Sequence, residues 1–123
     1  MLTELYERLE VLEVAEMISQ DISKETKLVI EKIVEEVNPT DEDAFQIFVI
    51  HYAMSMQRIE NGEVDFEVNE EIIESLKSNE GFEKSVELID WIKTLSNRTI
   101  PKGEQNLLLI HLCNLSSRKE GNQ

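Results

Sequence analysis

Glycine and proline are scarce in this 123-residue chain, with four and two copies, so few positions interrupt regular structure. Helix formers such as Leu, Glu and Lys are abundant instead. Apolar residues also recur at spacings of three and four, as Leu2, Leu5, Leu9 and Leu12 do, which is typical of amphipathic helices. The sequence therefore predicts an all-α fold with short connections. The expected helices span about 3–19, 23–37, 40–61, 69–78, 82–97 and 102–117.

Local signals mark where several of these helices begin and end. Pro39 disfavours helical geometry at Asn38, so the second helix should end before it. Thr40 is followed by acidic residues, as an N-cap residue is, and Gly62 has the character of a helix stop. The segment 62–68 alternates polar and apolar residues, and we expect an irregular connection there.

The expected organisation has three parts: an amphipathic amino-terminal helix at 1–19, a helical domain at 20–117 and a disordered tail at 118–123. The domain should be a compact bundle of five core helices. Two of them, at 40–61 and 102–117, are apolar nearly all round, which indicates burial on more than one side. In so small a chain, such faces suggest a homodimer.

The net charge of −14 argues against direct binding of nucleic acid. Residues 1–43 hold thirteen acidic and four basic side chains, and the densest basic group, Arg118 and Lys119, lies in the expected tail. Proteins that neutralise phosphates cluster Lys and Arg on one surface instead. The acidic excess serves either solubility or attraction to a basic partner protein.

The apolar runs are also far shorter than the roughly 18 residues of a membrane-spanning helix, and Met1 is not followed by a signal peptide. We therefore expect a cytoplasmic protein without membrane contact. The single cysteine, Cys113, lies in an apolar helical run, where it should behave as a small buried hydrophobe.

His51 and His111 are the only histidines, and each lies in an apolar helical stretch. An unperturbed imidazole is largely neutral and nucleophilic near pH 7. Arg58 follows His51 by seven residues and Glu104 precedes His111 by seven, two helical turns in each case, so each pair shares a helix face. The arginine would then face an anion near His51, and the carboxylate would set the tautomer of His111.

A histidine on an apolar helix is nevertheless more often a packing residue than a reactive one. The sequence contains neither an HxxxH pair nor a Cys/His cluster, so no metal site or cofactor is expected. It also contains no nucleophile elbow and no glycine-rich phosphate loop, which disfavours free-standing catalysis. Packing and a regulatory role both remain open for the two histidines.

Two segments, FQIFVIHYAMSMQRIENGE and IPKGEQNLLLIHLCNL, resemble the paired motifs of the PTS regulation domain, or PRD, of bacterial transcriptional antiterminators and activators. The likeness covers about residues 20–117. It implies a homodimeric helical bundle, not an enzyme, in which His51 and His111 accept phosphoryl groups and Arg58 and Glu104 hold supporting motif positions. It also implies phosphorylated HPr or an enzyme II B component of the sugar phosphotransferase system as the donor.

The chain departs from the family pattern at two points. Ile50 stands where family members often carry an acidic residue before the first histidine. The motifs are not joined to an RNA-binding or helix-turn-helix domain, so the chain looks like a stand-alone PRD with an extra amino-terminal helix, acting through a separate regulator protein. Two functions are therefore expected as alternatives: histidine phosphorylation that controls a partner or transcription, or a structural adaptor that keeps the scaffold without its chemistry.

Overall fold

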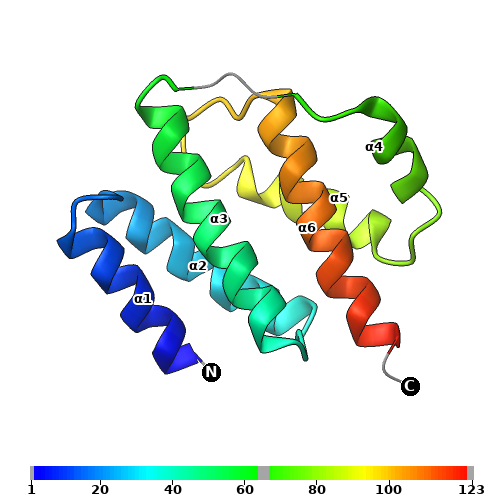
Figure 1. The fold of residues 1–123 in the computed structure, drawn as a ribbon, viewed down its shortest axis with the longest axis horizontal. Coiled ribbons are helices and arrows are strands. Elements are labelled where there is room, and N and C mark those ends of the chain that lie inside the picture. Colours follow the sequence, from blue (N-terminus) through cyan, green and yellow to red (C-terminus); the bar gives the residue numbers. More distant parts are fainter. Residues whose placement is uncertain (1, 64–66, 122–123) are drawn as a thin grey trace.

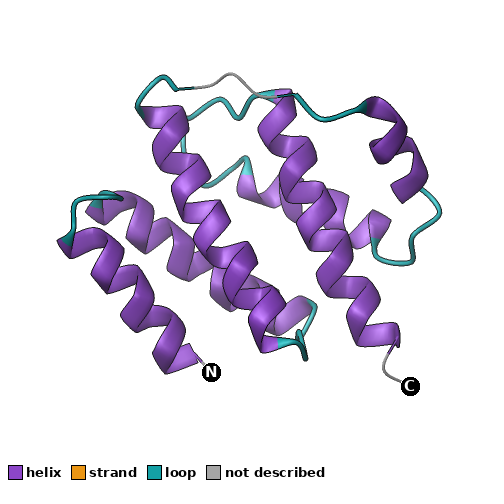
Figure 2. Ribbon diagram, in the orientation of Figure 1, coloured by secondary structure: helices purple, strands orange, loops and turns teal. Residues whose placement is uncertain are grey.

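The described secondary structure is entirely helical. The computed structural model describes residues 2–63 and 67–121, with side chains as far as Leu115, and these residues form six helices and no strand. Figure 2 shows the helices joined by loops alone, which confirms the predicted all-α fold. The helices are α1 (Leu2–Val14), α2 (Gln20–Glu36), α3 (Glu42–Glu60), α4 (Glu70–Leu76), α5 (Phe82–Ile92) and α6 (Lys102–Gly121).

The turn that ends α1 is made by backbone hydrogen bonds without a glycine. Glu16 adopts a left-handed conformation, with φ of 60°. The Met17 amide donates to the Leu12 carbonyl at 2.9 Å and the Glu16 amide donates to the Glu13 carbonyl at 3.0 Å, which are the two hydrogen bonds of a Schellman motif. This motif stops α1 at Val14, whereas the sequence predicts a helix as far as Ser19.

Side chains cap the starts of α2 and α3. Ser19 is the N-cap of α2, and its hydroxyl accepts from the Ile22 amide at 3.1 Å. Asp41, rather than the expected Thr40, is the N-cap of α3 and accepts from the Ala44 amide at 3.0 Å. Both oxygens satisfy amides that a helix leaves without an internal partner, so each helix begins at a defined residue.

Pro39 marks the end of α2 as predicted, since the helix stops at Glu36 and Asn38 turns into the left-handed region with φ of 50°. Of the expected 62–68 connection, residues 64–66 lie outside the described residues. None of the described helices is both long and apolar enough to cross a membrane.

The last two helices differ in length from the prediction. α5 ends at Ile92 rather than near residue 97, and the weak helix formers Thr94, Ser96 and Asn97 lie in the loop that follows. α6 continues through 118–121, where the sequence predicts a disordered tail, because Arg118, Lys119 and Glu120 are good helix formers. Residues 122–123 lie outside the described residues.

The two histidine-bearing helices, α3 and α6, lie side by side and run in opposite directions (Figure 1). α2 passes behind α3 and α5 behind α6, while α1 packs on α2 and α4 packs on α6. Side chains from these helices form one core. Its largest fully buried apolar members are Leu5, Leu9, Ile22, Ile30, Ile33, Phe45, Phe48, Tyr52, Met56, Leu108 and Leu112.

α1 is anchored in this core by one face only. Leu5 and Leu9 have no exposed surface, and their spacing of four places them on the same side of the helix. Val11 and Val14, in contrast, are 65% and 77% exposed. The amphipathic character predicted for α1 therefore corresponds to packing against α2.

A buried charged network joins the loop before α6 to α2 and α3. Arg98 donates from Nη1 to both carboxylate oxygens of Glu25, at 3.0 and 3.1 Å, and from Nη2 to Glu60 at 2.8 Å. The Tyr52 hydroxyl donates to the same Glu25 carboxylate, and burial, followed by the charge of Glu25, raises the pKa of Tyr52. The Arg98 and Glu25 side chains are only 8% and 9% exposed, so each charge depends on the other.

Replacing this arginine tests how much the network stabilises the fold. Arg98→Met should lower the free energy of unfolding by about 3 to 5 kcal/mol, because it leaves the Glu25 carboxylate buried without its cation. Lys93→Met is the matched control, since Lys93 forms only a surface ion pair with Asp90, and its cost should stay below about 1 kcal/mol. Urea unfolding followed by circular dichroism measures both variants, and equal stabilities would contradict the expectation.

Candidate functional site: a histidine pair between α3 and α6

The two histidines of the chain meet across the interface of α3 and α6. Nδ1 of His51 lies 3.1 Å from Nε2 of His111, within hydrogen-bonding distance. The ring centroids are 4.9 Å apart and the ring planes are nearly perpendicular, at 89°. Residues sixty positions apart in the sequence therefore form one chemical unit.

This contact couples the protonation of the two rings. A neutral imidazole carries one N–H and one lone pair, and a hydrogen bond needs one donor and one acceptor. The outer nitrogens, which lie outside this contact, are Nε2 of His51 and Nδ1 of His111. If His51 donates from Nδ1, then Nε2 of His51 keeps a free lone pair and Nδ1 of His111 holds a proton. If His111 donates, the free lone pair lies on its own Nδ1 instead. The neutral pair thus presents one unprotonated outer nitrogen at a time.

The surroundings of the two rings differ. His51 is exposed, whereas His111 is half-buried and lies edge-on to Phe48, with ring centroids 6.5 Å apart. Burial, followed by the charge of His51, lowers the pKa of His111 below its ordinary value of 6.5. His111 therefore resists protonation. Phe48 is a site residue that the sequence indicates only as an apolar residue of its helix.

A second contact between α3 and α6 lies two helical turns away from the histidines. Arg58 donates from Nη2 to both oxygens of Glu104, at 3.3 and 3.2 Å, and to Oγ of Ser55 at 3.0 Å. The helices are antiparallel, so Arg58, seven residues after His51, lies opposite Glu104, seven residues before His111. At 1.5 Å per residue, the two contacts are about 10 Å apart along the helices.

The pairs expected within each helix are therefore replaced by pairs between the two helices. The sequence indicates Arg58 beside His51 and Glu104 beside His111, each within one helix. In the structure each histidine instead pairs with the other, and the arginine pairs with the glutamate. Glu104 is 1% exposed and lies in the first turn of α6, where the helix dipole also favours a carboxylate. Each tautomer thus depends on the opposite ring rather than on a carboxylate.

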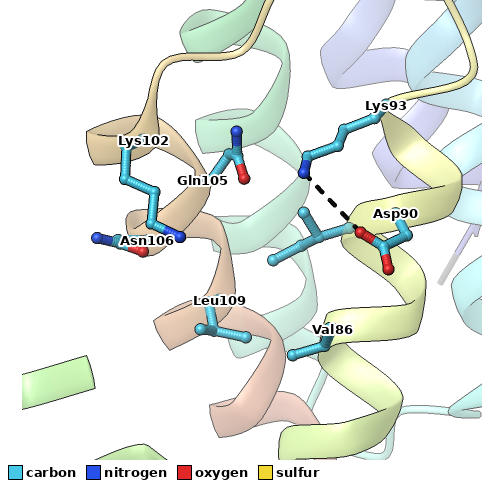
Figure 3. Close-up of a pocket in the computed structure, with 8 residues that line it drawn as sticks. Val86, Asp90, Lys93, Lys102, Gln105, Asn106 and Leu109 are labelled. Carbon is cyan, nitrogen blue, oxygen red and sulfur yellow. Dashed lines mark ion pairs between the residues drawn. The ribbon is translucent and has the colours of Figure 1, made fainter. Parts of the chain in front are cut away.

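A separate hollow of about 190 Å³ lies between α5 and α6 (Figure 3). Val86 and Leu109 form part of an apolar wall, and Lys93 and Asp90 form a 3.9 Å ion pair at its edge. Neither histidine lines it. Throughout the described part of the chain, no three His, Cys, Asp or Glu side chains gather as a metal site would require. The histidine pair is therefore the candidate functional site.

The lowered pKa of His111 should be visible in an NMR titration of the ring protons. His111 should titrate below pH 6.5, because burial and the neighbouring ring both disfavour its charged form. In His51→Ala its pKa should move back toward 6.5, since the variant removes the neighbouring charge and opens the site to water. A His111 ring that titrates at or above pH 6.5 in the native chain would contradict this.

The same shift makes stability depend on pH. Between the folded pKa of His111 and its unfolded value near 6.5, the unfolded chain binds more protons than the folded chain. The contribution of His111 to the free energy of unfolding is therefore complete above the unfolded pKa near 6.5. It is lost as the pH falls through the folded pKa. His111→Gln should flatten this part of the profile, measured by urea unfolding at a series of pH values, and an unchanged slope would argue against it.

Comparison with known protein families matches residues 24–115 to the PRD domain. No curated protein and no solved structure matches the chain. The matched range contains both histidines, Arg58 and Glu104, whereas α1 lies outside it. The family resemblance noted in the sequence is thereby confirmed, and the chain belongs to the PRD domain family, which implies a regulatory module of the sugar phosphotransferase system.

Proposed function

We propose that this PRD domain accepts a phosphoryl group on histidine and thereby controls a partner protein or transcription. The contact between His51 and His111 carries the proposal, because it leaves one outer nitrogen unprotonated and lies between the two helices that bear the motifs. His51 is the main acceptor, since its ring is exposed to a protein donor. His111, which is half-buried, is the second acceptor.

The transfer requires little chemistry from the chain beyond positioning a nucleophile. With phosphorylated HPr as donor, Nε2 of His51 supplies the electron pair of the new P–N bond while the P–N bond of the donor phosphohistidine breaks. That electron pair returns to the donor ring, which keeps the proton on its other nitrogen and leaves as neutral imidazole. His51 retains the proton on Nδ1, directed at Nε2 of His111. A phosphorylated enzyme II B component is the alternative donor.

Phosphorylation of His51 then makes His111 a poor acceptor. The arrangement that frees Nε2 of His51 places a proton on Nδ1 of His111, so that nitrogen has no lone pair to offer. The phosphoryl group also adds charge beside a chain whose net charge is already −14. The two acceptor positions are therefore alternatives within one chain.

The output we propose is a change in self-association, which a separate regulator protein reads. A homodimer is the state that the family resemblance implies, and α3, which bears His51, is one of the two helices that the apolar pattern indicates for its contact. A phosphoryl group adds about −1.5 to −2 charges by analogy with other phosphorylated side chains, and charge disfavours an apolar interface. The phosphate therefore interacts differently with the monomer and with the dimer, which is what a population shift requires.

A purely structural adaptor is the second candidate function. One observation favours it: Arg58, the cation expected to serve a phosphoryl group at His51, instead donates from Nη2 to Glu104 and Ser55. In that case the histidine pair would join α3 to α6 as a packing contact, and the chain would act through dimerisation alone.

Labelling by a phosphorylated donor separates the two functions. Incubation with phosphorylated HPr, and separately with a phosphorylated enzyme II B component, should add acid-labile phosphate, detected by intact mass at neutral pH and after acid treatment. His51→Ala should lose most of this label in a short reaction because the exposed ring is gone, His111→Ala should keep it, and the double variant should have none. No label in the native chain with either donor would support the adaptor instead.

The stoichiometry of labelling tests the coupling between the rings. At saturation the native chain should carry one phosphoryl group rather than two, since each protonation arrangement exposes one acceptor nitrogen. Intact mass spectrometry resolves the two species without fragmentation. A doubly phosphorylated chain as the major product would refute mutual exclusion while leaving phosphorylation itself intact.

A further inference from the structure

A surface hollow of about 410 Å³ lies directly beside His51. It is formed between α1 and the first half of α3. Its lining residues are Arg8, Asp43, Gln46, Ile47, Ile50 and His51. The main acceptor ring therefore opens onto a space that the amino-terminal helix helps to shape.

Arg8 is the unusual member of this hollow. It is the only basic residue before Lys24, on a helix that otherwise carries acidic charges at Glu4, Glu7, Glu10 and Glu13. Among the described residues, no ion pair or hydrogen bond engages its guanidinium, and its side chain is exposed. Arg58 differs in this respect, because its Nη2 donates to Glu104 and Ser55.

The position of Arg8 is set by its neighbours on α1. Leu5 and Leu9, on either side of it in sequence, are fully buried and hold the helix against the core. The backbone of Arg8 thus belongs to a helix that is held against the core. The matched PRD range begins at residue 24, so this cation comes from a part of the chain that lies outside the family match.

Arg8 gives the hollow a cation that can bind a phosphoryl group. A guanidinium binds the oxygens of a phosphoryl group through paired, charge-assisted hydrogen bonds. Asp43 also lines the hollow and repels such a group, so Arg8 is the cation that offsets this charge among the lining residues. Ile47 and Ile50 add an apolar wall on which the edge of a donor protein can pack.

We infer that Arg8 binds the phosphoryl group of the donor protein as it passes to His51, so that α1 completes the acceptor site. This inference rests on the proposed function. The hollow receives the phosphorylated side chain of the donor, Arg8 contacts the phosphoryl oxygens, and His51 supplies the attacking nitrogen. In this arrangement α1 supplies the cation at His51, since Nη2 of Arg58 donates to Glu104 about two helical turns away.

The test compares initial rates of phosphorylation by phosphorylated HPr in His111→Ala chains, in which only His51 accepts. Arg8→Ala should lower the rate at least about tenfold, the loss expected when one charge-assisted hydrogen bond is removed. Arg8→Lys keeps the charge but not the paired hydrogen-bond geometry, so its rate should lie between those of the parent chain and Arg8→Ala. Lys27→Ala, the same change of charge at an exposed position outside the hollow, should match the parent chain.

Thermal unfolding of each variant serves as the folding control. Arg8→Ala should unfold at the same temperature as the parent chain because Arg8 is exposed. If the parent is labelled and Arg8→Ala is labelled as fast as Lys27→Ala, the role of Arg8 is refuted and the proposed function stands. If the native chain is not labelled by any donor, the proposed function fails and this inference fails with it.

Discussion

The ion pair between the buried carboxylate of Glu104 and the partly exposed guanidinium of Arg58 is the contact on which the site depends. Glu104 is almost completely removed from water, and a buried carboxylate is costly unless a cation stays beside it. Sliding α6 along α3 by one turn would leave this charge uncompensated. The register that satisfies it is also the register that brings His51 and His111 into contact, because both pairs are seven residues apart on antiparallel helices.

The rest of the bundle supports that interface. Arg98 joins Glu25 of α2 to Glu60 of α3 from the loop before α6, so three separate segments are held by one guanidinium. Leu5 and Leu9 bring α1 into the same core. The charged groups inside the molecule are thus paired between elements, while the ring of His51 lies exposed at the surface. The scaffold therefore holds the two imidazole rings in contact, so that the protonation of each ring depends on the other.

Much of the fold could be predicted from sequence because helix formation is encoded locally. The scarcity of glycine and proline, the apolar periodicity and the break at Pro39 indicate the six helices and most of their order. The prediction was less accurate at helix ends. Glu16 adopts a left-handed conformation that the Schellman hydrogen bonds support, and the sequence has no glycine there to indicate the end of α1. The sequence pattern around Arg98 and Arg8 did not indicate their roles either, since Arg98 pairs with residues far away in the chain and Arg8 lines a hollow with residues of α3.

By itself, the sequence determined the helical class, the family motifs and the four residues that mark the candidate site. Spacing along a helix shows which side chains share a face, but it does not show which residues of other helices lie opposite that face. Only the tertiary structure decided that the histidines pair with each other, that Arg58 neutralises Glu104, and that Arg8 lies beside His51. The physical reason is that these contacts depend on how α1, α3 and α6 pack, and packing is set by the burial of side chains from the whole chain.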